Sequence, residues 1–273
     1  MRNKHLKIFV SPAEITGSTA LLLAVLLGWF QPILAAIPLS FFLLICCSAP
    51  FFPGFAFYLP IISHGRPQTT GIALTFDDGP SPSSTLVLLD LLSRHHLPAT
   101  FFLVGEKAAQ HPELITAILA GGHSIGNHSW RHDYYLMLRS AKVLREDIRQ
   151  TQEILKKSGV TPFVFRPPVG VTGPRLGKAL ASENLIAVNY SCRAFDRGNR
   201  NVRDLAGKIL RRLKPGDIIM LHDLPPLQKE QAGYWQRELD RLFSALSEQN
   251  RVVPLAEIIQ RPVDEKSRKI EIR

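Results

Sequence analysis

Two adjacent aspartates end an apolar run in the stretch GIALTFDDGP, residues 71–80. Asp77 and Asp78 are followed by Gly79 and Pro80, which is a good turn sequence, so two solvated carboxylates in a turn are one interpretation. The other is a division of labour: one carboxylate binds a metal, and its neighbour stays free as a general base whose pKa the cation and a basic partner hold in range. The pair therefore points to acid–base chemistry at the end of a buried segment.

A second stretch with chemical potential is HSIGNHSWRH, residues 123–132. His128 and His132 are four residues apart, so one helical turn would bring both imidazoles to the same side. Two imidazoles and one carboxylate form a three-ligand divalent site with positions left open for water, the pattern of catalytic zinc. Two histidines at this spacing are also common on surfaces and in cores. A carboxylate at a strand end elsewhere, and Gly126 with Asn127 in a tight loop, favour the metal site.

The elements that must position these residues alternate from Gly71 onward. We expect strands at 72–76, 100–104, 163–165, 186–190 and 218–221, with a weaker one at 124–125. We expect helices at 83–94, 112–119, 140–158, 174–183, 202–213 and 237–248, the third capped by Ser140 and ended by Gly159. Strands apolar on both faces and separated by helices predict a parallel sheet covered by helices, either closed as a barrel or doubly wound.

Polar residues that follow the apolar runs are the first candidates for a site, because ligands in such folds bind at the carboxyl ends of the strands. Asp77 and Asp78 follow the first run, and Arg166 follows the run at 163–165. Asp196 lies beyond the run at 186–190, and His222 follows the last run. These five groups on four strand ends could converge on one pocket.

Five motifs in order carry a resemblance to a known family: TFDDGP, the H-S-W-R-H spacing, FRPPVG, the aspartate after SCRAF, and MLHD. From about Gly71 to Ile259 the chain resembles the NodB-type polysaccharide deacetylases, also called carbohydrate esterase family four. The resemblance implies a distorted parallel (β/α) barrel of about seven strands. It also implies a metal-dependent hydrolase of carbon–nitrogen bonds other than peptide bonds, which removes an N-acetyl or other small N-acyl group from an amino sugar.

The resemblance assigns the metal half of the site residue by residue. Asp78 matches the metal-binding carboxylate, with His128 and His132 as the imidazole ligands. Asp77 matches the general base that takes a proton from the attacking water, and Arg166 matches the arginine that pairs with this base. One divalent ion is implied, with zinc favoured and cobalt or another divalent ion as alternatives.

The resemblance also assigns the other half of the site. The backbone amide of Val169, where the family usually has tyrosine, is expected to help bind the oxyanion. His222 matches the acid that protonates the leaving amine, Asp196 the carboxylate that orients it, and Leu221 a wall of the acyl pocket. Arg197 replaces the tryptophan that usually follows the fourth-motif aspartate, and Arg193 stands where the family often has aspartate, so these changes bear on acyl and sugar specificity.

Other classes of function fit the sequence less well. A non-catalytic carbohydrate-binding or scaffolding domain that retains the fold would have a broken ligand set. An iron facial triad needs an H-x-D/E adjacency, and a haloacid-dehalogenase-type phosphatase needs aspartates two residues apart. We interpret His123 as a loop-shaping residue, and Arg145, Glu146, Asp147 and Arg149 as a solvated helix face.

The stretch between Glu14 and Arg66 has no Asp, Glu, Lys or Arg. At roughly fifty residues it exceeds twice the ~20 needed for one bilayer crossing. We expect an integral membrane anchor of two helices, near 15–30 and 33–52, with the turn at Pro32 or Pro38. One span with an interfacial segment is the alternative. The basic N-terminus is expected in the cytoplasm, so a hairpin returns the rest of the chain to that side and a single span exports it.

These observations divide the chain into a basic tail at 1–14, a membrane segment at 15–63, a linker at 64–70, the deacetylase-like domain at 71–262 and a basic tail at 263–273. The formal net charge is +10. No aromatic-interleaved basic motif accompanies it, so we expect no nucleic-acid partner. Attraction to anionic lipid headgroups or a lipid-linked phosphate fits a tethered basic domain. The expected partners are thus an amino-sugar glycan or lipid-linked sugar and the lipid bilayer, with no obligate protein partner indicated.

Overall fold

One sheet of parallel strands forms the centre of the molecule in the computed structural model, which describes residues 10–249 and 251–270. Within these residues the strands are β1 Ile61–Ile62, β2 Ala73–Gly79, β3 Thr100–Leu103, β4 Ser124–Asn127, β5 Val164–Phe165, β6 Ile186–Val188, β7 Cys192–Arg193 and β8 Ile218–His222. Their order across the sheet is β1-β6-β5-β4-β3-β2-β8-β7. Because β1 and β7 are the two ends of this order, the sheet curls as a half-barrel and does not close. The parallel-strand barrel architecture is confirmed, with eight strands.

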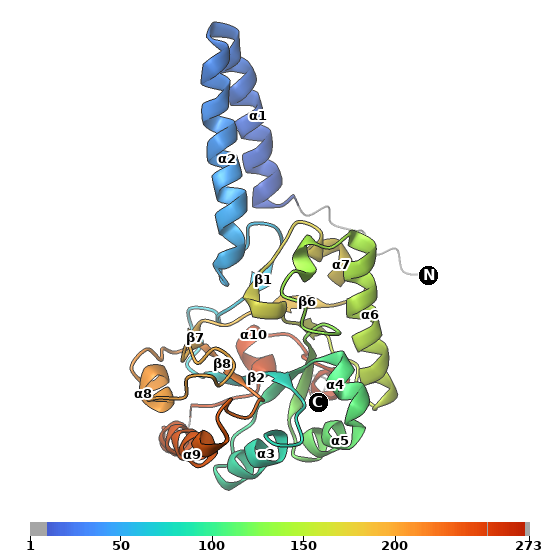
Figure 1. Cartoon of the computed structure of the whole chain (residues 1–273), viewed down its shortest axis with the longest axis vertical. Coiled ribbons are helices and arrows are strands. Elements are labelled where there is room, and N and C mark those ends of the chain that lie inside the picture. Colours follow the sequence, from blue (N-terminus) through green and yellow to red (C-terminus); the bar gives the residue numbers. More distant parts are fainter. Residues whose placement is uncertain (1–9, 250, 271–273) are drawn as a thin grey trace.

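Helices cover the sheet on its outer side and ends (Figure 1). They are α3 Thr85–Arg94, α4 Gly105–Gln110, α5 Pro112–Ala120, α6 Ala141–Lys157, α7 Leu176–Ser182, α8 Leu205–Leu210, α9 Ala232–Glu248, α10 Leu255–Ile259 and α11 Glu265–Ile270. Single 3₁₀ turns lie at η1 Pro32–Ala35, η2 Ala49–Phe51, η3 Leu136–Leu138, η4 Pro168–Gly170 and η5 Lys229–Gln231. The predicted cap of α6 is confirmed, since the Ser140 side chain accepts a hydrogen bond from the Val143 amide.

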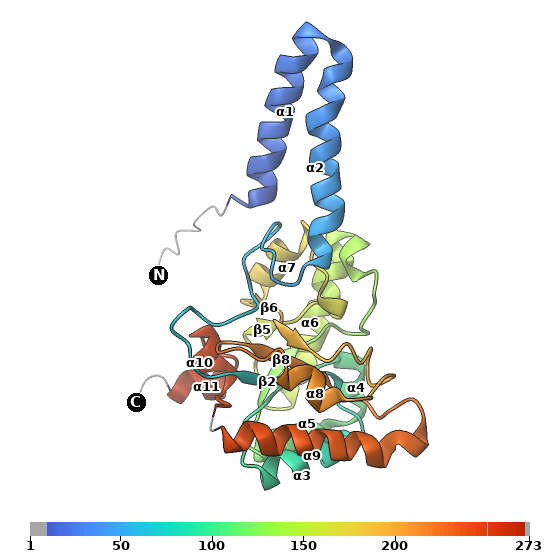
Figure 2. The same cartoon turned by 90° about the vertical axis from the view of Figure 1, so that its left-hand side faces the viewer.

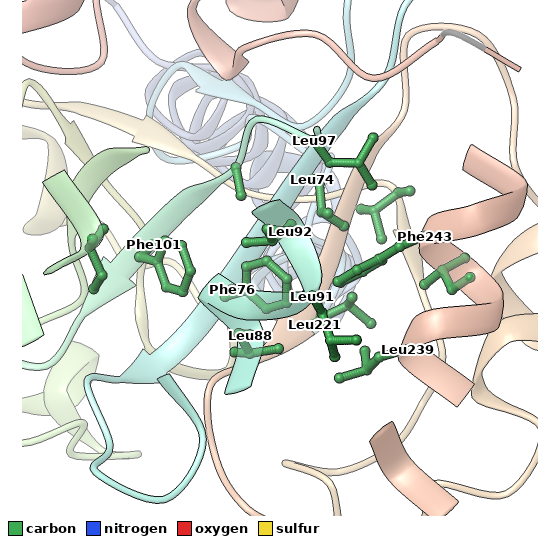
Figure 3. Close-up of a cluster of buried hydrophobic side chains, with 14 of the residues drawn as sticks. Leu74, Phe76, Leu88, Leu91, Leu92, Leu97, Phe101, Leu221, Leu239 and Phe243 are labelled. Atoms are coloured by element: carbon green, nitrogen blue, oxygen red, sulfur yellow. The ribbon is translucent and has the colours of Figure 1, made fainter. Parts of the chain in front are cut away.

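The main hydrophobic core lies between the sheet and the helices α3 and α9 (Figure 3). Phe76 of β2 is fully buried there, with its ring centroid 5.0 Å from that of Phe101 on β3. Leu88 of α3 and Phe243 of α9 pack against the same cluster. Burying each such side chain stabilises the fold by roughly 1.5–3 kcal/mol, so the central strand that carries the two aspartates is held firmly.

A pair of apolar helices stands away from this domain, as Figures 1 and 2 both show. They are α1 Pro12–Phe30 and α2 Ala36–Ser48, joined by η1, so the turn lies at Pro32 and Pro38 belongs to the second helix. Two helical segments, 12–30 and 32–51, are long and apolar enough to cross a bilayer, and only 11% and 6% of them is buried in the protein. Length and composition fit membrane spans and also a signal sequence near the N-terminus.

The folded domain extends beyond the expected boundaries 71–262 at both ends. Strand β1 lies within the range expected to be membrane segment, and it pairs with β6. At the other end, Val263 and Asp264 are buried, and Asp264 bridges to Pro162. Sequence periodicity does not reveal these edges because a two-residue strand and a single buried turn are too short to show a period.

Candidate active site

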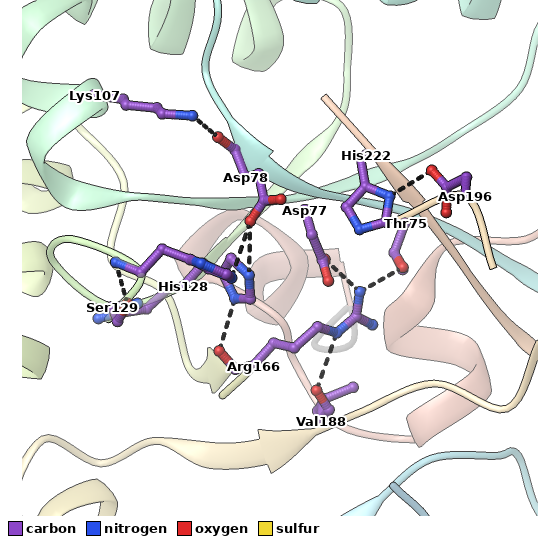
Figure 4. Close-up of polar contacts among 12 residues, drawn as sticks. Thr75, Asp77, Asp78, Lys107, His128, Ser129, Arg166, Val188, Asp196 and His222 are labelled. Atoms are coloured by element: carbon purple, nitrogen blue, oxygen red, sulfur yellow. Dashed lines mark hydrogen bonds and ion pairs between the residues drawn. The ribbon is translucent and has the colours of Figure 1, made fainter. Parts of the chain in front are cut away.

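The carboxyl ends of β2, β4, β5 and β8 open onto one cavity of about 860 Å³. The sequence-predicted residues that line it are Asp77, Asp78, His128, His132, Val169, Asp196 and His222. Asp77 of β2 and His222 of β8 are direct neighbours in the sheet register. The prediction that polar groups on several strand ends converge thus agrees with the geometry, and Figure 4 shows most of them around the end of β2.

The carboxylate of Asp78 lies between two imidazoles. Its Oδ1 is 3.4 Å from Nε2 of His128 and 3.2 Å from Nε2 of His132. This oxygen is buried and has no hydrogen-bond partner among the described residues. One ligand atom from each of the three residues lies within 4.8 Å of the others, an arrangement that could hold a metal ion.

Hydrogen bonds fix the orientation of the two imidazoles. Nδ1 of His128 lies 2.8 Å from the carbonyl oxygen of Arg166, which can only accept, so Nδ1 donates and Nε2 is the ring atom turned to Asp78. The amide of His132 donates to Oγ of Ser129. Burial, and then the charge of His128, lowers the pKa of His132 to about 4. Neutral imidazoles with free Nε2 lone pairs are suited to binding a cation.

The five-residue segment that carries the two histidines is a loop and not a helical turn. Ser129 and His132 have left-handed φ values of 69° and 54°. Asn127 holds this loop at its start, because its Oδ1 accepts from the Ser129 amide and its Nδ2 donates to the Ile148 carbonyl of α6. The imidazoles therefore converge through turn geometry, and their spacing of four is compatible with both forms.

Asp77 is buried and paired with Arg166. Nη1 of Arg166 donates to Oδ1 of Asp77 at 2.6 Å and to Oγ1 of Thr75 at 2.7 Å. Arg166 is itself fully buried, and its guanidinium lies 4.0 Å from the ring centroid of Phe102. This charge-assisted hydrogen bond fixes the orientation of the Asp77 carboxylate at the end of β2.

His222 and Asp196 form a second charged pair across the cavity. Nδ1 of His222 lies 2.7 Å from Oδ2 of Asp196, which also accepts from the amide of Asn199. Burial lowers the pKa of His222, but the hydrogen bond and charge of Asp196, with Asp78 and Asp77, outweigh it and raise this pKa to about 9. His222 is thus protonated near neutral pH and leaves Nε2 as a proton donor.

Comparison with known proteins decides the family. Residues 64–187 match the family model described as "Polysaccharide deacetylase". A chitooligosaccharide deacetylase of Bradyrhizobium is 33% identical over 180 residues, which cover 66% of this chain and 82% of the relative. The chain belongs to the polysaccharide deacetylase family. A peptidoglycan-N-acetylglucosamine deacetylase of Listeria monocytogenes is 33% identical over 56% of this chain, but the match spans only 32% of that relative.

A solved structure supports the same assignment. A peptidoglycan N-acetylglucosamine deacetylase, crystallised with 4-naphthalen-1-yl-N-oxidanyl-benzamide, superimposes with a TM-score of 0.67 at 30% identity. The match covers 74% of this chain and 94% of the solved one.

The family-derived expectation for Leu221 is wrong. Leu221 is buried in the core beside Phe76, whereas Met220 lines the cavity together with His222. Successive side chains of a strand point to opposite faces, so the residue two before His222 shares its face and the residue one before does not. Val169 does line the cavity and has a left-handed φ of 51°.

One supporting residue was misread in the sequence. Asp147, expected on the solvated face of α6, accepts the backbone N–H of Trp130 at 2.8 Å and so ties the histidine loop to the helix. Burial raises its pKa to about 6. Asp147 lies three residues after Leu144 and one before Ile148, which are both buried residues of α6. This spacing places it next to the apolar stripe and is the signal that could have identified it.

Proposed function

We propose that this chain is a metal-dependent hydrolase that removes an N-acetyl or other small N-acyl group from an amino sugar. The observation that carries the proposal is the convergence of Asp78, His128 and His132 beside two proton-transfer pairs. The chain's relatives named above support it, since they are deacetylases of peptidoglycan and chitooligosaccharide.

The residues present fit a divalent cation. Oδ1 of Asp78 is buried with no hydrogen-bond partner among the described residues, and it faces Nε2 of both imidazoles, so a cation bound among these atoms would satisfy it. Two imidazoles and a carboxylate suit zinc best, and we propose zinc as the ion. A cation bound there would supply Lewis-acid chemistry, lowering the pKa of water at the site and polarising the substrate carbonyl.

Asp77 is the proposed general base. Arg166 holds its carboxylate at the cavity floor, with one oxygen committed to the guanidinium. The other oxygen can take a proton from the attacking water, and the pairing with Arg166 holds the carboxylate in one orientation. The Val169 amide, on a turn at the cavity wall, is the proposed donor to the oxyanion.

His222 is the proposed general acid. Its Nδ1–H is fixed on Asp196, so the proton on Nε2 faces the cavity and can pass to the leaving amine nitrogen. The amide C–N bond then breaks with the amine leaving neutral. Met220, on the same face of β8, would form a wall for the small acyl group.

The substrate is proposed to be an amino-sugar glycan or lipid-linked sugar at a membrane surface. The two apolar helices support a two-pass anchor, and the +10 net charge supports attraction to anionic lipid. The rival function, a non-catalytic carbohydrate-binding domain, has less support because the residues proposed as metal ligands, base and acid all line one cavity.

Metal removal tests the proposal directly. Chelation of the purified full-length protein should abolish acetate release from N-acetylated amino-sugar oligomers, and added zinc should restore it. His128→Ala should lose both metal and activity. The control His96→Asn changes an exposed histidine with a left-handed backbone that asparagine also tolerates, and it should retain both. Full activity in metal-free protein would overturn the proposal.

A further inference from the structure

A second hollow, of about 310 Å³, adjoins the active-site cavity. Tyr190, Arg193 and Phe195 line both hollows, so the two are contiguous. We call the second one the hairpin groove; its other lining residues are Pro53, Gly54, Ser63, Ser191, Cys192 and Arg212. It leads from the proposed reaction site toward the base of the apolar helices.

Hydrogen bonds attach the base of the helical hairpin to this groove. Pro53 and Gly54 lie just after η2, separated from it by Phe52, and the Pro53 carbonyl accepts from Nδ2 of Asn189 at 3.0 Å. The Ala13 amide at the start of α1 donates to the Phe57 carbonyl at 3.0 Å. In Figure 1 strand β1 lies just below the hairpin. The groove is therefore held where α2 ends and the domain begins.

Two arginines gather in the hairpin groove without an acidic partner. The guanidinium of Arg193 lies 4.3 Å from the ring centroid of Phe195, and that of Arg212 lies 5.1 Å from the same centroid. Neither forms an ion pair with a carboxylate in the part of the chain that the structure describes. The nearby carboxylate of Asp217 is occupied, accepting from Oγ of Ser191 at 2.6 Å and from the Lys214 amide.

The shared ring is also unusual. Phe195 is 51% exposed and has a left-handed φ of 56°, which is costly for a large residue. Both guanidinium groups lie against this ring, so an anion bound beside Phe195 would be attracted by two positive charges. Guanidinium groups donate paired N–H groups that match the oxygens of a phosphate.

We propose that the hairpin groove binds the phosphate ester of a lipid-linked amino sugar, with Arg193 and Arg212 as donors to its oxygens. This inference rests on the proposed function, because it places the amide of the same substrate in the active-site cavity. The sugar then occupies the cavity, the phosphate lies beside Phe195, and the lipid chain extends along the hairpin. Arg197 and Arg200 line the active-site cavity, so in this arrangement they lie near the sugar and not near the phosphate.

The test compares three substrates for the full-length protein in neutral lipid vesicles. They are a prenyl-phosphate-linked N-acetylamino sugar, the water-soluble N-acetylamino sugar 1-phosphate, and the unphosphorylated methyl glycoside. Arg212→Gln should reduce kcat/KM about tenfold or more for both phosphorylated substrates and leave the methyl glycoside unchanged, since a charge-assisted hydrogen bond is lost. The matched control is Arg211→Gln, an adjacent exposed arginine that is paired with Asp204 at 2.8 Å, and it should behave as the wild type.

Three results would overturn the inference. The first is an equal loss of kcat/KM in Arg212→Gln for the phosphorylated and the unphosphorylated substrates. The second is an unchanged kcat/KM in Arg212→Gln for all three substrates. The third is activity on the methyl glycoside that rises with phosphatidylglycerol in the vesicles and loses this rise in Arg212→Gln, because the groove would then bind a headgroup and not the substrate. If wild-type protein hydrolyses none of the three substrates with zinc present, the proposed function itself fails.

Discussion

Asp77 and Asp78 are neighbours on one strand, yet both reach the cavity. In a regular strand neighbouring side chains point to opposite faces. Asp78 departs from this rule because its φ is 72°, in the left-handed region, so its carboxylate turns toward the imidazoles while that of Asp77 meets Arg166. Their like charges are offset by different partners, which fits two separate roles.

The pH dependence tests the acid. His222 must be protonated to act, so activity falls as pH rises through its pKa, which Asp196 raises against the effect of burial. In Asp196→Asn the pKa of His222 should fall, so the alkaline limb of the kcat/KM profile should shift to lower pH by about one unit or more. The control Asp204→Asn, which changes an exposed carboxylate paired with Arg211, should leave the limb in place. An unmoved limb in Asp196→Asn would remove Asp196 from the proposed pair.

At this scale most of the candidate site could be predicted from the sequence. The proposed base Asp77, the proposed ligand Asp78 and the proposed acid His222 follow apolar runs directly. The chemistry of a carboxylate or an imidazole then limits the roles that each residue can have. The error at Leu221 has a simple physical cause: the wall of a pocket next to His222 must come from the same strand face, which is that of Met220. The position of Asp147 cannot be predicted from helix periodicity alone. A residue at the margin of the apolar stripe is exposed or covered depending on the neighbouring loop, which here is the histidine loop with Trp130.

Among the elements, β4 shows how packing supports the chemistry. Gly126 lies opposite Phe102 in the register of β3 and β4, and a Cβ atom there would come within 2.5 Å of the Phe102 ring. Phe102 in turn stacks under Arg166, the partner of Asp77. Because Gly126 has no side chain, the Phe102 ring has space to pack against Arg166, the partner of Asp77.

Gly126→Ala should destabilise the protein by about 1–3 kcal/mol, because the added methyl group overpacks a buried aromatic contact. Urea unfolding measures this loss. Gly233→Ala is the matched control: its new Cβ would meet only the end of the Arg237 side chain, in a helix, and it should stabilise by up to about 1 kcal/mol. Equal stability of Gly126→Ala and the wild type would contradict the packing described for β4.

The longer elements could be predicted from periodicity, and the two short edge strands could not. Helix α6 has a clear apolar stripe and a serine cap, so its bounds agree with the sequence within one residue. Strands β1 and β7 have two residues each and exist because the sheet offers an edge to pair with. That edge is a property of the assembled fold, and no local pattern encodes it.

At the scale of the whole molecule, the apolar hairpin and the groove at its base are the features that bear on the proposed substrate. Both apolar helices are almost unburied by the domain, and the groove at their base has two arginines that form no ion pair among the described residues. This arrangement suits a substrate that is itself held at a lipid surface, and the sequence predicted the hairpin from its run of uncharged residues.

Reporter fusions test the two-pass anchor. Two spans return the chain to the side of the basic N-terminus. A reporter that works only in the cytoplasm should therefore be active when fused after residue 273, and an export-dependent reporter should be inactive there. The control is a fusion within η1, between the spans, where an export-dependent reporter should be active. An export-dependent reporter that is active at the C-terminus would contradict the hairpin and favour a single span or a cleaved signal.

The central claim is that Asp78 holds the metal and Asp77 moves the proton. Metal content and deacetylase activity, measured on the same preparations of Asp77→Asn and Asp78→Asn, test it most directly. Asp77→Asn should bind one divalent ion per chain and be inactive, by a factor of about 10² or more, because a general base contributes at least that much. Asp78→Asn should lose the ion as well as the activity. Full activity in Asp77→Asn, or a full metal complement in Asp78→Asn, would contradict the account.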